Sequence, residues 1–287
     1  MTKSEELRQK VLRYITGGKE LATLWGVAQR VREITSDQHA SLKELVKVIG
    51  ADPILTSKVL RLVNSAAYGF RGRIANIDQA IVILGFRQLR DLCITLTIVK
   101  GVGTESRCED FDRISLWKHS LGTAVASKLI QERYTGSQSS DLFVAGLLCN
   151  IGRLILDQHF AKEFSQTLKL AKDKGIRLIE AERRILDVTH ADIGYWAATA
   201  WCLDDTLAGS IRDHHGPSGN RNADIINLAY VLAQLKGVGS PGDPMLTMLL
   251  PGILENLKLD QEKLAIIMKD LDEEFEMVEP LLRIMTE

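Results

Sequence analysis

Four histidines stand where helical periodicity places chemically active side chains, either within a helix or at a helix end. His119 lies inside a long amphipathic segment, His190 opens a helix, and His214 and His215 close another. Imidazole groups bind metals and move protons near neutral pH, so these positions are candidates for a reactive site. The alternative for each one alone is a structural histidine that satisfies a hydrogen bond or a helix dipole.

A group of basic residues is the second candidate. Four arginines stand near the helix start expected at Asn76, where guanidinium groups and free amides favour an anion. Such an anion is a nucleotide phosphate or an acidic partner protein. The alternative is salt bridging with nearby acids such as Asp78 and Asp91. The four arginines are Arg71, Arg73, Arg87 and Arg90.

The elements that must position these residues are predicted to be helices. Helical periodicity runs nearly end to end, and no segment shows the alternation of a strand. A capping box begins at Ser41, Asp52 before a proline begins the next helix, and Asn76 begins a short helix that ends at Gly85. A glycine turn is expected at Gly152. Further helices are expected at 86–100, 111–134, 141–148, 161–174, 179–186, 190–202, 205–214, 223–235 and 260–285.

The polar, glycine-containing stretch 101–110 is the best internal boundary. It divides the chain into an N-terminal amphipathic helix (1–19), an N-terminal subdomain (20–105) and a C-terminal part (106–287). Short, glycine-punctuated connections before the boundary predict helices that cross at steep angles. The predicted fold class is therefore all-α, with an N-terminal orthogonal helical subdomain packed on a C-terminal helical bundle. The helix at 111–134 is expected to bury Ile114, Leu121, Val125 and Leu129.

Charge and composition exclude several functional classes. Lys and Arg number 36 against 37 Asp and Glu, so no excess positive field favours nucleic acid. The charged first residues do not read as a signal peptide, and no stretch reaches the roughly 18 uncharged apolar residues of a membrane span. The cysteines are scattered and read as reduced thiols, so a cytoplasmic protein is expected. They are Cys93, Cys108, Cys149 and Cys202.

Four motifs follow one another in an order that identifies a family. They are Asp52–Gly69 (DPILTSKVLRLVNSAAYG), Asp78–Arg90 (DQAIVILGFRQLR), Trp117–Ser120 (WKHS) and Ala145–Leu148 (AGLL). Together they resemble HDOD proteins, which are bacterial relatives of the HD-domain phosphohydrolases, from about residue 20 to residue 280. The family's proline-rich opening is replaced here by Leu21–Trp25.

The resemblance implies a metal-hydrolase site from which the acidic ligands are missing. In active HD enzymes the matching helices supply a histidine, then a His-Asp pair, then a distant aspartate. The cyclic di-GMP-cleaving branch adds further histidines. Here Cys149-Asn150 occupies the His-Asp place and, by helix position, Asn227 occupies the last aspartate place. The resemblance assigns the other ligand places to His119, His190, His214 and His215.

These replacements predict the loss of hydrolysis by two bridged metals. An asparagine amide is neutral and binds cations weakly, so the negative charge that offsets two cations is gone. A single zinc, iron or nickel ion is the remaining option, and the alternative is a polar core network without a metal. The candidate ligands of that single ion are His119, Cys149, His190, His214 and His215.

Three functional hypotheses follow, and the leading one is a non-catalytic regulatory module of bacterial signal transduction. Such a module acts in trans on signalling proteins, through protein–protein contacts. The alternative is a residual single-metal phosphohydrolase acting on nucleotides or cyclic dinucleotides. A third hypothesis is a sensor that binds a nucleotide without cleaving it. Neither nucleic acid nor a membrane is expected as a partner, and the sequence predicts no oligomeric state.

Overall fold

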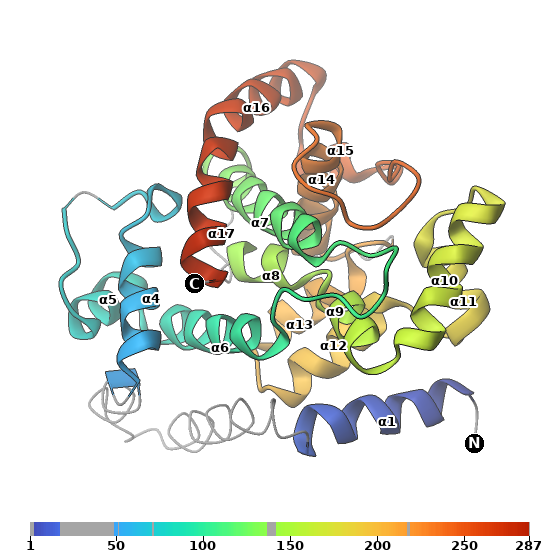
Figure 1. Cartoon of the computed structure of the whole chain (residues 1–287). Helices are drawn as coiled ribbons and strands as arrows, with labels where there is room; N and C mark the ends of the chain where they lie inside the picture. Colours follow the sequence, from blue (N-terminus) through green and yellow to red (C-terminus); the bar gives the residue numbers. More distant parts are fainter. Residues whose placement is uncertain are drawn as a thin grey trace.

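The computed structural model describes residues 3–17, 49–50, 52–70, 72–136, 142–216 and 219–286. Every regular element within these ranges is a helix, which confirms the all-α prediction (Figure 1). The α-helices are α1 Lys3–Gly17, α4 Pro53–Val63, α5 Ile77–Leu84, α6 Phe86–Val102, α7 Arg113–Leu129, α8 Leu142–Leu148, α9 Ile151–His159, α10 Ala161–Lys174, α11 Leu178–Leu186, α12 His190–Ala200, α13 Asp205–Asp213, α14 Arg221–Leu235, α15 Ile253–Leu257, α16 Gln261–Glu274 and α17 Val278–Thr286.

Two helix starts follow the predicted local chemistry. The Asp52 side chain accepts hydrogen bonds from the amides of Ile54 and Leu55, and Pro53 is the first residue of α4. The Asn76 side chain accepts from the amide of Gln79, so α5 begins where expected. The capping box at Ser41 and the segment Leu21–Trp25 lie outside the described residues.

The first cluster of helices contains α4, α5 and α6, and α17 from the end of the chain packs on it (Figure 1). Val59 and Leu62 of α4 are buried, and so is most of α6. The buried Lys58 amine donates to the Met285 carbonyl at 2.9 Å, which fixes α17 against α4. The last helix of the chain therefore packs on helices from its first third.

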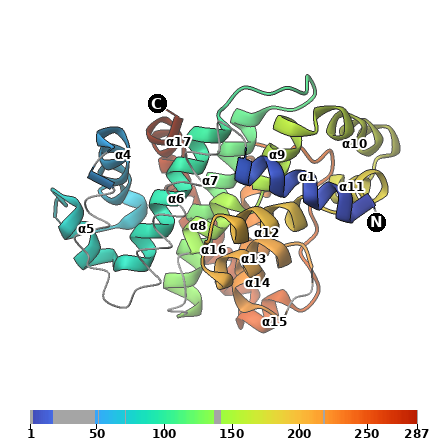
Figure 2. The same ribbon diagram turned by 90° about the horizontal axis from the view of Figure 1, so that it is seen from below.

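The second cluster is built around α7, which packs along α8 and α14, while α12 packs on α9 and α13. Helix α1 lies across α12 and α11, as seen from below in Figure 2. The Lys3 amine of α1 donates to the Ile185 carbonyl of α11. The N-terminal helix thus packs on the C-terminal part of the chain.

Two local predictions were wrong. The turn between α8 and α9 falls at Cys149-Asn150, and Gly152 lies inside helix α9 instead of in that turn. A Cβ at Gly152 would lie 2.0 Å from the His190 carbonyl oxygen, so glycine allows α9 and α12 to touch. Ile114 was expected inside with Leu121, but it is 48% exposed because it stands in the first turn of α7 at the surface.

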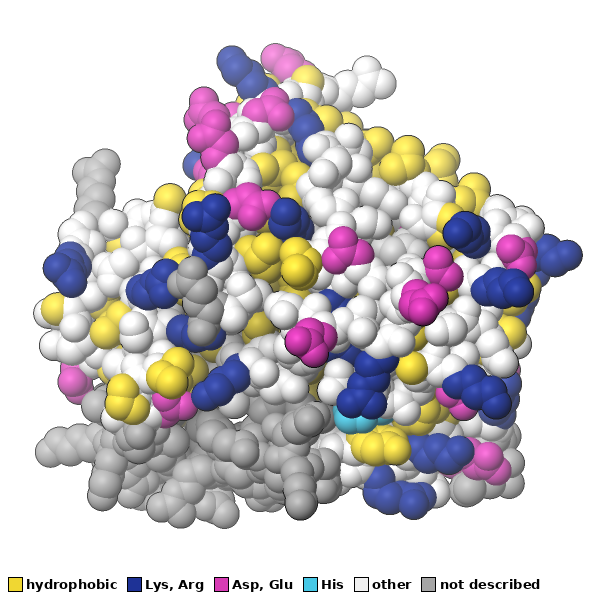
Figure 3. Space-filling model, in the orientation of Figure 1, with side chains coloured by type: hydrophobic (Ala, Val, Ile, Leu, Met, Phe, Trp, Pro, Cys, Tyr) yellow, Lys and Arg dark blue, Asp and Glu magenta, His cyan; other side chains and the backbone are white. Residues whose placement is uncertain are grey.

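Charges of both signs are interspersed over the face of the molecule in Figure 3. No described helix combines the length and the apolar character that crossing a bilayer requires.

A candidate site at the buried histidines

Three of the predicted histidines meet in the core. His190 is the first residue of α12, while His214 and His215 follow α13. One ligand atom from each lies within 4.8 Å of the others. The capping box of Thr189 and Asp192 starts α12 and so determines where His190 stands. We call His190, His214 and His215 the histidine triad.

One ring nitrogen of each triad residue is open, and His190 and His214 are each held through the other ring nitrogen. The Glu182 carboxylate lies 2.7 Å from Nδ1 of His190 and also accepts from its backbone amide at 2.8 Å. Nδ1 of His214 bonds the Ile211 carbonyl at 2.6 Å. The Nε2 atoms of all three residues are buried without a hydrogen-bond partner among the described residues. Metal-binding histidines are oriented in this way.

The triad is neutral at physiological pH. Burial lowers the pKa of His214 to about 4, and the positive charge of Arg153 contributes to the lowering. Burial likewise lowers the pKa of His190 and His215 well below the ordinary histidine value, and Arg153 adds to both shifts. Neutral imidazole is the form that binds a metal ion.

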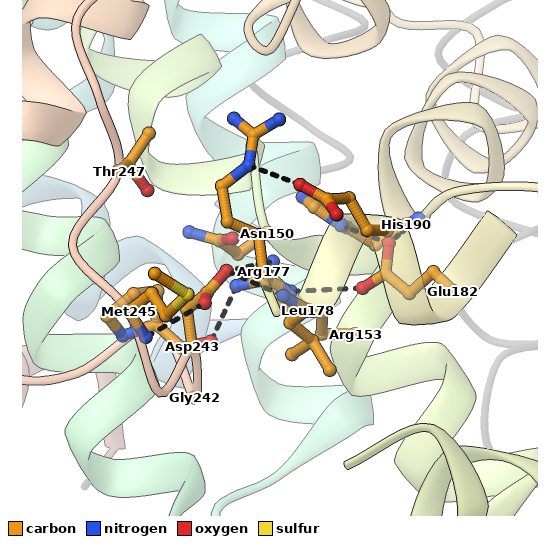
Figure 4. A network of polar contacts seen from close by, with 12 residues as sticks. Asn150, Arg153, Arg177, Leu178, Glu182, His190, Gly242, Asp243, Met245 and Thr247 are labelled. Carbon is orange, nitrogen blue, oxygen red and sulfur yellow. Dashed lines mark hydrogen bonds and ion pairs between the residues drawn. The ribbon is translucent and has the colours of Figure 1, made fainter. Parts of the chain in front are cut away.

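Arg153 and Glu182 form the charged centre beside the triad, and both side chains are fully buried (Figure 4). Nε of Arg153 lies 3.3 Å from Glu182, and Nη1 donates to the Pro241 carbonyl at 2.6 Å and to the Tyr230 hydroxyl at 3.3 Å. Nη2 has no hydrogen-bond partner among the described residues, and Asp243 lies 3.9 Å from it. The guanidinium thus joins α9, α11 and the loop after α14.

Sequence reasoning missed this pair, although the sequence contains a signal. Glu182 lies four residues after Leu178 and four before Leu186, which places it on the apolar side of α11. Arg153 interrupts the apolar run from Ile151 to Leu156. A charged residue on an apolar helix face is either buried with a partner or destabilising.

His119 lies outside the triad. It is fully buried in α7, with its ring edge-on to Tyr230 at 4.4 Å between centroids, and neither nitrogen makes a hydrogen bond of normal geometry to the described part of the chain. Tyr230 also contacts the rings of His214 and His215, at 6.0 and 5.1 Å. Burial, with Arg153 nearby, lowers the pKa of His119 to about 3.

Cys149 and Asn150 lie close together at the break between α8 and α9. The Asn150 amide nitrogen is 3.4 Å from the Cys149 sulfur and 3.5 Å from the Ser120 hydroxyl. Burial raises the pKa of Cys149 to about 12, so the sulfur carries a proton unless a cation displaces it. The amide nitrogen of Asn227 donates to the His214 carbonyl at 2.7 Å, which places Asn227 beside the triad.

The predicted arginine face is divided among separate partners. Arg90 pairs with Asp91 at 2.7 Å, as the salt-bridge alternative predicted. Arg87 lies 3.5 Å from Asp204, which is on a different segment from the predicted acid Asp78. Arg73 is exposed beside an open cleft of about 610 Å³, and Arg71 lies outside the described residues.

The donor set fits one transition-metal ion and does not fit a bridged pair. Three neutral imidazoles with open Nε2 atoms suit a single zinc, iron or nickel ion. A bridged pair needs a free carboxylate between the ions. Two buried carboxylates lie beside the triad, and both are already engaged. Glu182 accepts from Arg153 and His190, and Asp243 accepts from the amides of Leu178 and Met245.

The sequence also matches a known family model over most of its length. The HDOD domain model matches residues 21–217. The chain belongs to the HDOD family. An uncharacterized protein of Treponema pallidum is 27% identical over 187 residues, which cover 64% of this chain and 36% of that protein. The chain thus spans about a third of the length of this curated relative.

Solved structures show the same HDOD fold. An HDOD domain protein of unknown function from Geobacter sulfurreducens is 27% identical with a TM-score of 0.72, covering 96% of this chain and 99% of its own. A conjectural phosphohydrolase from Shewanella amazonensis SB2B is 23% identical with a TM-score of 0.65, covering 89% and 92%. A conjectural signal transduction protein from Marinobacter aquaeolei VT8 is 21% identical with a TM-score of 0.65, covering 99% and 66%.

Proposed function

We propose that this HDOD chain is a non-catalytic regulatory module of bacterial signal transduction, which acts on proteins in trans through protein–protein contacts. The observation that carries the proposal is the engagement of the buried carboxylates. Glu182 is shared between Arg153 and His190, while Asn150 and Asn227 stand where a hydrolase would present acids. A water activated between two cations needs a free carboxylate to hold those cations.

The fixed charge of Arg153 supports the same conclusion. A guanidinium stays protonated at every physiological pH, and this one is fully buried. Its field lowers the pKa of His119, His190 and His214 after the larger effect of burial. The same positive charge disfavours a metal ion at the triad, and the paired Glu182 carboxylate offsets it in part.

A turnover measurement tests the proposal. The purified chain is supplied with manganese, iron or zinc and offered cyclic dinucleotides, linear dinucleotides and a chromogenic phosphodiester. We expect no hydrolysis above that of the double variant His190→Ala/His214→Ala. Metal-dependent turnover that this double variant lacks would sink the proposal.

A residual single-metal phosphohydrolase is the second candidate, and the three open Nε2 atoms of the triad favour it. A metal held by His190, His214 and His215 would polarise a phosphoryl oxygen. This candidate requires one metal per chain together with measurable turnover. If a metal is bound but no turnover is measured, the triad has a structural or sensing role, and the result supports the regulatory proposal.

Ligand sensing is a form of the regulatory proposal that a surface cleft supports. A cleft of about 530 Å³ is lined by Arg183, Arg212, Thr189 and His215, so it opens beside the triad. Asp187, Asp192 and Asp213 line it as well, and Arg212 is paired with Asp213 at 2.7 Å. Arg183 is therefore the guanidinium that would bind a phosphate there. Calorimetry with a panel of nucleotides measures this directly, and the absence of heat at millimolar nucleotide removes the sensing form.

A further inference from the structure

The segment after α14 exposes apolar side chains on the surface. Leu246 is 58% exposed and Met248 is 73% exposed. The preceding Met245 is 44% exposed, and Leu235, the last residue of α14, is 55% exposed. Figure 3 shows apolar side chains along the upper right of the molecule, over the part of the chain that follows α14 in Figure 1. Thr247 lies between the two most exposed residues and is 8% exposed.

The Gln234 side chain holds this segment in an extended form. Its amide nitrogen donates to the Met245 carbonyl at 3.1 Å, and its oxygen accepts from the Thr247 amide at 2.9 Å. A carbonyl and the amide two residues later face one side only where the chain between them is extended, as in a strand. The alternating burial of Leu246, Thr247 and Met248 agrees with this conformation.

The opposite side of the segment is an unpaired edge. If Met245 and Thr247 direct these groups toward Gln234, Leu246 and Met248 direct their amides and carbonyls the other way. None of these four peptide groups has a hydrogen-bond partner among the described residues. An extended, uncharged edge with exposed apolar side chains is a template for pairing with another strand.

We propose that this edge pairs with the same edge of a second copy of the chain, around a two-fold axis at Thr247. Antiparallel pairing places Leu246 opposite the partner's Met248, and the reverse. All four unpaired peptide groups of each copy are then satisfied by reciprocal hydrogen bonds. The second copy is the occupant because it supplies an equally uncharged edge, so no charge is buried without a partner.

Hydrogen bonds of Arg153 and Asp243 connect the loop before the pairing edge to the core beside the histidine triad. Arg153 donates to the Pro241 carbonyl, and the Asp243 carboxylate accepts from the amides of Leu178 and Met245. The loop therefore enters the edge from a buried anchor and is preorganised for pairing, which lowers the entropic cost of association.

The mass in solution tests the proposal. We expect the full chain to sediment as a concentration-dependent dimer, and Met248→Glu to raise its dissociation constant at least about tenfold. Val82→Glu is the matched control, because Val82 is 84% exposed on α5 and should leave the dimer unchanged. A wild-type monomer at the highest concentration, or a dimer that Met248→Glu does not weaken, would overturn the proposal.

The register has its own test. Leu246→Lys alone should weaken the dimer, and adding Met248→Glu should restore it, since the two new charges then face each other across the axis. Thr247→Cys should cross-link under mild oxidation, because residues in a non-hydrogen-bonded pair lie about 4.5 Å apart at Cα. Leu246→Cys should not cross-link, and the wild-type chain controls for its own cysteines. Equal cross-linking at 246 and 247 would overturn this register.

Discussion

Two arginines are buried among the described residues, and their surroundings differ. Arg113 is 1% exposed, and each of its three guanidinium nitrogens donates a hydrogen bond. Nε donates to Asp157, Nη1 to the Val102 carbonyl at 2.6 Å and Nη2 to Gln158 at 2.7 Å. Asp157 also accepts from the amides of Arg107 and Cys108. This network is closed, and it fixes the connection between α6 and α7.

The network of Arg153 is open by comparison. Nη2 has no hydrogen-bond partner among the described residues, and the Glu182 carboxylate is divided between Arg153 and His190. The Nε2 atoms of the histidine triad are open beside it. A closed network only holds the chain together, whereas an open one retains the capacity to bind a further group.

Arg113→Met should give the largest loss of folding stability. It leaves the buried Asp157 without its guanidinium, so we expect unfolding to become easier by about 3–5 kcal/mol. Urea denaturation measures the change, and Arg107→Met, on an exposed side chain nearby, should stay within about 0.5 kcal/mol. Equal effects of the two substitutions would show that the closed network contributes no stability.

Arg153→Met should cost less stability and strengthen metal binding. The Arg153 bonds to Glu182 and Tyr230 are long, at 3.3 Å, and its Nη2 has no hydrogen-bond partner among the described residues, so we expect a loss of about 1–3 kcal/mol. Removing the positive charge should raise zinc affinity about tenfold and raise the pKa of His214. Zinc titration and proton NMR measure these two quantities. Unchanged zinc affinity would contradict the repulsion that we assign to Arg153.

The free energy of unfolding should depend on pH through the buried His214 beside Arg153. The pKa of His214 falls from 6.5 in the unfolded chain to about 4 in the folded one, so the unfolded chain binds more protons between these values. Stability is therefore fully present above about pH 6.5 and is lost as the pH falls toward 4, by up to about 1.4 kcal/mol per pH unit for this group. His214→Gln should flatten the slope, and an unchanged slope would contradict a neutral buried imidazole.

The sequence predicted the helices well where local chemistry decides them. Asp52 and Asn76 cap their helices with side-chain oxygens, as their residue types predicted. Gly152 was misread because a glycine suits both a turn and a close helix contact. Only the position of α12 against α9 distinguishes the two, and that contact joins distant parts of the chain.

The sequence predicted only part of the site, because the rest depends on contacts between distant parts of the chain. Residue type identified His190, His214 and His215, which the fold brings together. His119 and Cys149 were grouped with them by resemblance, and the ring of Tyr230 contacts His119 as well as His214 and His215. Which buried charges face a site depends on tertiary packing, so Arg153 and Glu182 could not be placed from periodicity alone.

The number of metal ions bound per chain tests the central claim most directly. The purified protein is titrated with zinc, dialysed and analysed for metal against protein concentration, with His190→Ala/His214→Ala as the control. Because the Glu182 carboxylate is engaged and Arg153 is positively charged, we predict that the wild-type chain binds no more than one ion tightly. The control variant should not bind that ion. Two tightly bound ions per wild-type chain, both lost in the control, would contradict the account.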